Sequence, residues 1–173
     1  MRFKFLSVLA AVALVAACET APESSGNTQS SGGASTTSSS SAAPMTKVTI
    51  PPGTQEDLVV NVGDRVFFAL DSSELSAQAR TALEKQAAWV QKFGGVRIVI
   101  EGHADERGTR EYNLALGERR ANAAKDYLVA LGLNPSRIKT ISYGKERPAA
   151  RGHNEAAWAQ NRRSVTVVDT SGS

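Results

Sequence analysis

Asp105 and Arg120 are the two side chains of this sequence best suited to hold a ligand. They lie toward the two ends of a predicted strand-loop-helix unit, with Asp105 in the loop and Arg120 on the helix. A carboxylate accepts hydrogen bonds, whereas a guanidinium offers a planar fork of donors that can grip another carboxylate. The pair therefore predicts a clamp for a small molecule, and we expect both side chains at the surface of a pocket.

A strand and a helix must position these two residues. Apolar residues at 96, 98 and 100 alternate with Arg97 and Glu101, which is typical of a half-buried strand, and Gly102 is expected to end it. After the loop, a helix pattern begins near Glu111 and carries Arg120. Gly132 follows the last apolar position of that pattern and is expected to stop the helix.

The remaining sequence alternates predicted strands and helices. Residues 48–60 contain two consecutive prolines and are expected to form an extended arm. The further expected elements are a strand at 62–70, a helix capped by Ser76 and ended by Gly94 and Gly95, a strand at 137–143, one or two helical turns at 154–160 and a last strand at 164–169. Alternating elements followed by two successive strands predict an α/β (α+β) fold, a mixed sheet with helices packed on one face.

Three motifs, taken in order, resemble a known family. They are GHADERGTREYNLALGERRANAAK at 102–125, SYGKERP at 142–148 and NRRSV at 161–165. Over about residues 62–168 the chain resembles the OmpA-like peptidoglycan-binding domain, which implies a βαβαββ arrangement. The resemblance also implies that Asp105 and Arg120 hold diaminopimelate of the peptidoglycan stem peptide. Its far carbon carries an ammonium, which Asp105 would bind, and a carboxylate, which Arg120 would grip.

The resemblance points to further site residues. Asp71 lies where the family has another site residue, at the end of the first strand. Leu116 would form an apolar wall beside the ligand, unless it only packs in the core. Thr109 could donate to a ligand carboxylate, although capping the second helix is its simpler role. Arg162 and Arg163 precede the last strand and are expected to be rim or structural residues.

The residues alone leave other roles open for the central pair. Asp105 could cap its loop or form a surface ion pair with a neighbouring arginine. Arg120 could be a solvated partner of a carboxylate on its own helix. The arginines concerned are Arg107 and Arg110, and the carboxylates are Glu118 and Asp126.

The N-terminus has the pattern of a lipoprotein signal peptide. Two basic residues precede an uncharged apolar run at 6–17, which is shorter than the roughly 20 residues that span a bilayer. Small residues come just before Cys18, the only cysteine of the chain. We therefore predict a signal peptide at 1–17 and lipid attachment, including palmitate, at Cys18. The alternative is a free cysteine near an ordinary cleavage site.

The predicted domain boundaries follow a change in composition. Residues 19–46 are rich in Ser, Thr, Gly and Ala with hardly a large apolar side chain, so they predict a disordered tether. We assign the lipidated cysteine and the tether to 18–53, one binding domain to 54–170 and a short tail to 171–173. An Asp directly after the lipidated cysteine would favour retention in the inner membrane. This chain has Glu19 at that position, and the lack of the Asp favours the outer membrane.

The charge of the mature protein gives no argument for nucleic-acid binding. The chain has 20 Lys and Arg against 17 Asp and Glu. Removal of the signal peptide takes away Arg2 and Lys4, and 20 − 2 leaves 18 basic residues against the same 17 acidic ones. A nearly neutral protein can neutralise few phosphates, so we expect no nucleic-acid partner.

No catalytic or metal-binding motif is recognisable. The two histidines, His103 and His153, have no evident pairing, and the sequence lacks HExxH, GxSxG and a phosphate-binding glycine loop. Without an activated nucleophile a hydrolase is disfavoured. We therefore expect no enzyme activity, no cofactor and no metal, and the rival from another class is a peptidoglycan amidase or peptidase.

Together these features predict an outer-membrane lipoprotein that faces the periplasm. Its domain would tie that membrane noncovalently to peptidoglycan and so support envelope integrity and cell division. The family resemblance further implies the Tol proteins TolB and TolA as partners. The alternative within the same family is an OmpA-like lipoprotein of another envelope complex.

Overall fold

The computed structural model of this chain describes residues 49–170. The predicted signal peptide, Cys18, the tether up to residue 48 and the tail at 171–173 lie outside the described residues. Within 49–170, no helix is both long and apolar enough to cross a membrane.

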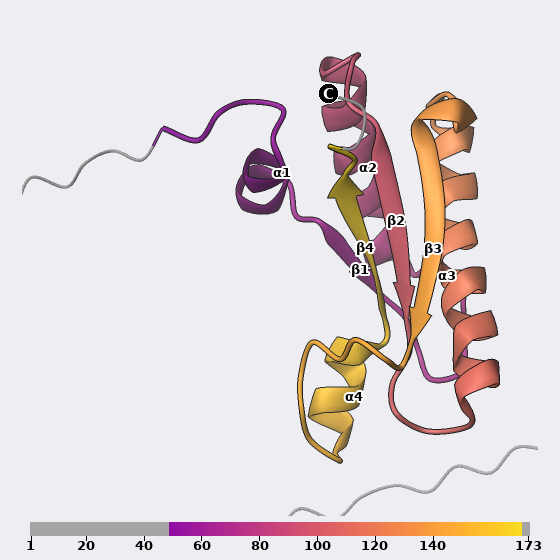
Figure 1. The fold of residues 1–173 in the computed structure, drawn as a ribbon. Helices are drawn as coiled ribbons and strands as arrows, with labels where there is room; N and C mark the ends of the chain where they lie inside the picture. Colours follow the sequence, from indigo (N-terminus) through magenta and orange to yellow (C-terminus); the bar gives the residue numbers. More distant parts are fainter. Residues whose placement is uncertain (1–48, 171–173) are drawn as a thin grey trace, which may run out of the picture. The chain divides into compact units, whose positions relative to one another are not determined.

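A single mixed sheet forms the framework of residues 49–170. Its strands are β1 (Arg65–Phe67), β2 (Ile98–His103), β3 (Ile138–Gly144) and β4 (Arg163–Val168). They lie in the order β1-β4-β2-β3 (Figure 1). β2 and β3 are parallel, whereas β4 is antiparallel to both of its neighbours. The last strand of the sequence therefore enters the middle of the sheet, and the predicted mixed sheet is confirmed.

Two long helices, α2 (Ala77–Lys92) and α3 (Arg110–Ala130), cover one face of this sheet (Figure 1). Their apolar residues form one core with the strands, including Leu83 and Val90 of α2, Ala121 and Leu128 of α3, and Ile98 and Ile100 of β2. The Ser76 hydroxyl caps α2 by accepting from the backbone N–H of Ala79 at 3.1 Å, as predicted. α3 ends just before Gly132, whose φ of +97° is the conformation that favours glycine after a helix.

Two short helices and one 3-10 turn complete the described fold. They are α1 (Gln55–Asn61), η1 (Pro135–Arg137) and α4 (Glu155–Asn161), and α4 lies in the connection from β3 to β4. The prediction of an extended arm at 48–60 is wrong because α1 occupies its second half. The Thr54 side chain accepts from the N–H of Asp57 at 3.3 Å, and Asp57 accepts from the N–H of Gly53 at 2.8 Å. This variant of the capping box, in which Asp57 accepts from the residue before the N-cap, starts α1, and the fully buried Leu58 holds the helix on the core.

β1 is shorter than the strand predicted at 62–70. Its pairing with β4 ends soon after Phe67, with one more hydrogen bond from the N–H of Phe68 to the carbonyl of Arg162 at 2.9 Å. The chain then turns, and Asp71 adopts a φ of 53°, which is uncommon for any residue but glycine. The turn carries Asp71 away from the sheet and toward α3, where Tyr112 contacts it.

Two glycines set how closely α3 approaches the sheet. β2 continues through Gly102 to His103, so the prediction that Gly102 ends the strand is wrong. A Cβ atom at Gly102 would lie 1.8 Å from the carbonyl oxygen of Gly117, and one at Gly117 would lie 2.4 Å from Oγ of Ser142. Because neither Cβ exists, α3 lies directly on β2 and β3. The start of α3 is thereby fixed beside the end of β2.

Candidate ligand-binding site

A pocket of about 380 Å³ lies where the loop after β2, the first turns of α3 and the turn after β1 meet. Four of the five predicted ligand-binding residues line it, and Thr109 does not. The lining residues are Leu70, Asp71, Asp105, Arg107, Gly108, Tyr112, Asn113, Leu116 and Arg120. Two carboxylates and two guanidiniums therefore face one small cavity. Such a set suits a ligand group that carries both a positive and a negative charge.

Asp105 is 5% exposed and is already paired. Its Oδ1 accepts from the backbone N–H of Arg107 at 3.1 Å and from Nε of Arg107 at 3.2 Å. Its Oδ2 accepts from Nη2 of Arg107 at 2.6 Å and from Nη1 of Arg162 at 3.4 Å. Burial alone would raise the pKa of Asp105, but these donors outweigh burial and hold the pKa below its ordinary value. The structure contains both alternatives considered for Asp105, the loop cap through the N–H of Arg107 and the ion pair with its side chain, of which the carboxylate is buried and the guanidinium half-buried.

Arg120 is completely buried at the floor of the pocket. Its Nε, Nη1 and Nη2 donate to the backbone carbonyls of Ser72, His103 and Ala69 at 2.8, 2.8 and 3.1 Å. The alternative of a solvated ion pair on α3 is therefore wrong, and so is the expectation of a surface position. Burial lowers the pKa of Arg120 to about 10, which leaves the guanidinium charged at neutral pH.

Asp71 and Tyr112 form another wall of the pocket. The Tyr112 hydroxyl donates to Oδ1 of Asp71, and this hydrogen bond raises the pKa of Tyr112. Asp71 keeps a left-handed backbone conformation in this position. Strained backbone of this kind occurs often at ligand sites, where the surrounding structure maintains it.

Leu116 and Thr109 have different places. Leu116 lines the pocket and lies outside the core cluster between the helices and the sheet, so it provides an apolar wall. The Thr109 hydroxyl accepts from the N–H of Tyr112 at 3.2 Å and caps the start of α3. The observed role of Thr109 is thus helix capping, the simpler of the two roles considered.

Sequence reasoning missed the part that two other arginines play around Asp105. Arg107 was considered only as a possible partner that would exclude a site, yet it lines the pocket itself. Arg162 was expected to be a rim or structural residue, and its buried guanidinium has a structural position, where it joins Asp105 to α4 through a 2.6 Å hydrogen bond to Glu155. No signal in the sequence indicated this contact, because it depends on the pairing of β4 with β2, which brings the residues before β4 next to the loop after β2.

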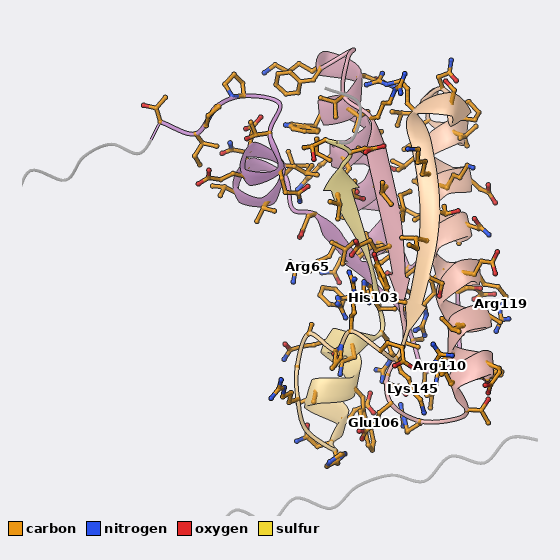
Figure 2. All side chains as sticks on the ribbon, in the orientation of Figure 1. Arg65, His103, Glu106, Arg110, Arg119 and Lys145 are labelled. Carbon is orange, nitrogen blue, oxygen red and sulfur yellow. The ribbon has the colours of Figure 1, made fainter. Side chains whose placement is uncertain are left out.

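The three sequence motifs meet at the loop that carries Asp105. Lys145 donates to the carbonyls of Glu106 and Gly108 at 3.2 and 2.7 Å. The Asn113 amide donates to the carbonyl of Arg107 at 2.8 Å. Figure 2 shows Glu106 and Lys145 together at this end of the sheet. The loop is therefore held by Lys145, which follows β3, and by Asn113 of α3. Residues from separate sequence motifs thus support the same loop.

Within 49–170, no group of three or more His, Cys, Asp or Glu side chains could hold a metal ion. Of the charged side chains that line the pocket, Asp105 pairs with Arg107, Asp71 accepts from Tyr112, and Arg120 donates to backbone carbonyls. The arrangement can therefore recognise charge and shape, and it presents no evident nucleophile.

Comparison with known proteins identifies the family. The sequence model of the OmpA family matches residues 67–162. A peptidoglycan-associated lipoprotein of Mesorhizobium japonicum is 57% identical over 122 residues, which are 70% of this chain and 73% of that protein. The chain belongs to the OmpA family. A peptidoglycan-associated lipoprotein of Pseudomonas aeruginosa is also 57% identical, over 97 residues that make up 56% of this chain and 57% of the relative.

Solved structures agree with this membership of the OmpA family. The peptidoglycan-associated lipoprotein from Burkholderia pseudomallei is 42% identical with a TM-score of 0.60, covering 61% of this chain and 90% of that one. The C-terminal domain of MotB from Helicobacter pylori is 25% identical with a TM-score of 0.58, covering 62% of this chain and 86% of that one. The resemblance seen in the sequence is confirmed, and none of these relatives has the name of an enzyme.

Proposed function

We propose that this OmpA-family protein is a lipoprotein that binds peptidoglycan noncovalently through diaminopimelate of the stem peptide. The observation that carries the proposal is the pocket itself, where Asp105 and Arg120 lie within one cavity of about 380 Å³. The names of its relatives support the same polymer as the ligand. The domain at 54–170 would be the binding unit.

The proposed role of each residue depends on its hydrogen-bonding groups, its charge and its position in the pocket. A guanidinium has five N–H donors, and three groups of Arg120 already donate to backbone carbonyls. At most two N–H groups remain, together with a positive charge below the ligand. Asp105 would accept from the ligand ammonium, Asp71 would face it from the other wall, and Leu116 would contact its methylenes. Thr109 would contribute only by holding the start of α3.

Binding of one stem peptide should be weak, and binding to the polymer should be strong. A charge-assisted hydrogen bond contributes about 1.5–3 kcal/mol, much of which the entropy of association offsets. Peptidoglycan repeats the stem peptide, and a tethered domain meets it at high effective concentration. We therefore propose lipid attachment at Cys18, a tether at 18–53 and a position in the outer membrane facing the periplasm. TolB and TolA remain proposed partners, in a Tol-Pal-like system for envelope integrity and cell division.

Sedimentation with purified sacculi tests this function. The full-length protein, solubilised in detergent, should pellet with diaminopimelate-type sacculi and release no soluble fragments. Soluble muropeptides would instead favour the rival amidase or peptidase. Protein that stays in the supernatant would contradict peptidoglycan binding altogether.

A further inference from the structure

In the free protein, the carboxylate of Asp105 has no acceptor position left for a ligand. A carboxylate has about four lone-pair positions, and four N–H groups occupy those of Asp105. Three of these donors belong to Arg107, at 3.1, 3.2 and 2.6 Å, and the fourth belongs to Arg162 at 3.4 Å. An incoming ammonium would also meet the positive charges of both arginines. A donor must therefore leave before Asp105 can bind a cationic group.

Arg107 is the arginine that is free to leave. The Arg162 side chain is 7% exposed and is tied to the carbonyl of Phe68 at 3.1 Å and to Glu155 at 2.6 Å. Arg120 is fully buried on three carbonyls. The Arg107 side chain is 35% exposed, and Asp105 is its only hydrogen-bond partner among the described side chains.

A second position for Arg107 is available on α4. Its guanidinium carbon already lies 4.1 Å from the centre of the Trp158 ring, a cation–π contact. Its Nη2 is 3.9 Å from a carboxylate oxygen of Glu155, too far for a hydrogen bond but close enough to attract. The guanidinium can therefore turn on the Trp158 ring without losing all of its contacts.

We propose that Arg107 determines specificity by exchanging partners when the ligand binds. Asp105 gives up Arg107 and accepts the ligand ammonium, while Arg107 gives up Asp105 and donates its planar fork to the ligand carboxylate. One internal ion pair is thus replaced by two ion pairs with a zwitterionic amino-acid group. A ligand with only an ammonium would leave Arg107 without a carboxylate, and the internal pair would compete with it. This inference rests on the proposed function and names the residue that selects the ligand.

Calorimetric titration with two peptides tests the exchange. The probes are L-Ala-γ-D-Glu-meso-diaminopimelate and its lysine counterpart, each titrated into the detergent-solubilised full-length protein. The wild type should prefer the diaminopimelate peptide by at least about fivefold, the lower end of what one unmatched charged group costs. Arg107→Gln should bring the preference close to one. It should also bind the lysine peptide more tightly than the wild type does, because Asp105 is then free of its internal partner.

Two further variants guard against a purely structural effect. Arg107→Lys keeps the charge but lacks the planar fork, so its preference should fall between those of the wild type and Arg107→Gln. Arg110→Gln removes a nearby exposed arginine that pairs with Glu146, and it should keep the wild-type preference. An equal loss of affinity for both peptides in Arg107→Gln, or an unchanged preference, would overturn the exchange. A wild type that binds neither peptide but still pellets with sacculi would overturn the exchange alone, and one that also fails to pellet would overturn the proposed function as well.

Discussion

At the scale of single residues, Arg120 carries a charge but is held like a residue of the core. Replacing it with Ala would remove the donors of three backbone carbonyls and leave a cavity. We expect Arg120→Ala to lower the free energy of unfolding by about 3–5 kcal/mol, as measured by urea denaturation. Arg120→Lys should also destabilise, because one ammonium cannot reach three carbonyls as the planar fork does.

Arg119 provides the matched control for this prediction. It is the neighbour of Arg120 on α3, is exposed and stands over the Tyr112 ring. Arg119→Ala should change the free energy of unfolding by no more than about 0.5 kcal/mol. If Arg120→Ala were as stable as Arg119→Ala, the three carbonyl contacts would not stabilise the fold.

His103 is a second buried polar residue with an unusual environment. It is 1% exposed, stacks on Tyr143, and neither ring nitrogen has a hydrogen-bond partner among the described residues. Glu101 lies 3.5 Å from Nε2 and would favour protonation. Burial and then the positive charges of nearby arginines outweigh it and lower the pKa of His103 from 6.5 to about 4. His103 is therefore neutral at physiological pH.

This lowered pKa predicts a loss of stability in mild acid. Between pH 6.5 and 4 the unfolded chain binds a proton that the folded protein excludes, so the free energy of unfolding falls as pH falls. The loss from this residue should reach about 3 kcal/mol at pH 4. His103→Phe keeps a ring against Tyr143 and removes the titration. Urea denaturation at pH 7 and pH 4.5 should show a smaller loss for the variant, and equal losses would contradict the assignment.

The sequence identified the members of the site better than their partners. Asp105 and Arg120 follow from a motif, and both line the pocket. The burial of Arg120 could not be predicted, because two of its acceptors, Ala69 and Ser72, come from a turn about fifty positions away. The pairing of Arg162 with Asp105 likewise depends on β4 entering the middle of the sheet.

At the scale of elements, the contact of α3 with β2 sets the geometry of the pocket. A Cβ atom at Gly102 would lie 1.8 Å from a backbone oxygen that cannot rotate away. Gly102→Ala should therefore push α3 off the sheet, lower the free energy of unfolding by roughly 3 kcal/mol or more and weaken peptidoglycan binding. Gly95→Ala is the control, because a Cβ there meets nothing within 4 Å. Similar stability and binding of the two variants would contradict a role for the close contact.

Element prediction failed where the decisive signal was short. The capping box at Thr54 is only four residues long, and the neighbouring prolines suggested extended chain instead. Gly102 was predicted to end its strand because glycine often breaks strands. In the structure its missing side chain makes room for α3 instead. The long helices were predicted well, since their apolar periodicity extends over many residues. The strands at 138–144 and 163–168 lie within one residue of their predicted bounds.

At the scale of the whole molecule, the proposed attachment to a membrane depends on Cys18. Buried acyl chains contribute about 0.8 kcal/mol per methylene, so two or more chains make detachment very slow. Cys18→Ser should block lipid attachment, as checked by mass spectrometry, and leave the fold of the domain intact. The variant should also be absent from outer membranes that have been freed of peptidoglycan. Its persistence in those membranes would argue against a lipid anchor.

We propose that the whole protein recognises the cell wall through the diaminopimelate that enters this pocket. Lysine-type stem peptides keep the ammonium that Asp105 would bind but lack the carboxylate that Arg107 would grip. An unpaired, partly buried cation costs about 1–3 kcal/mol, or roughly 5- to 150-fold in affinity. The most direct test is to measure the affinity of the full-length protein for diaminopimelate-type and lysine-type peptidoglycan at one ionic strength. The account predicts at least a fivefold preference for the diaminopimelate type, and equal affinities would contradict it even if binding to both walls were strong.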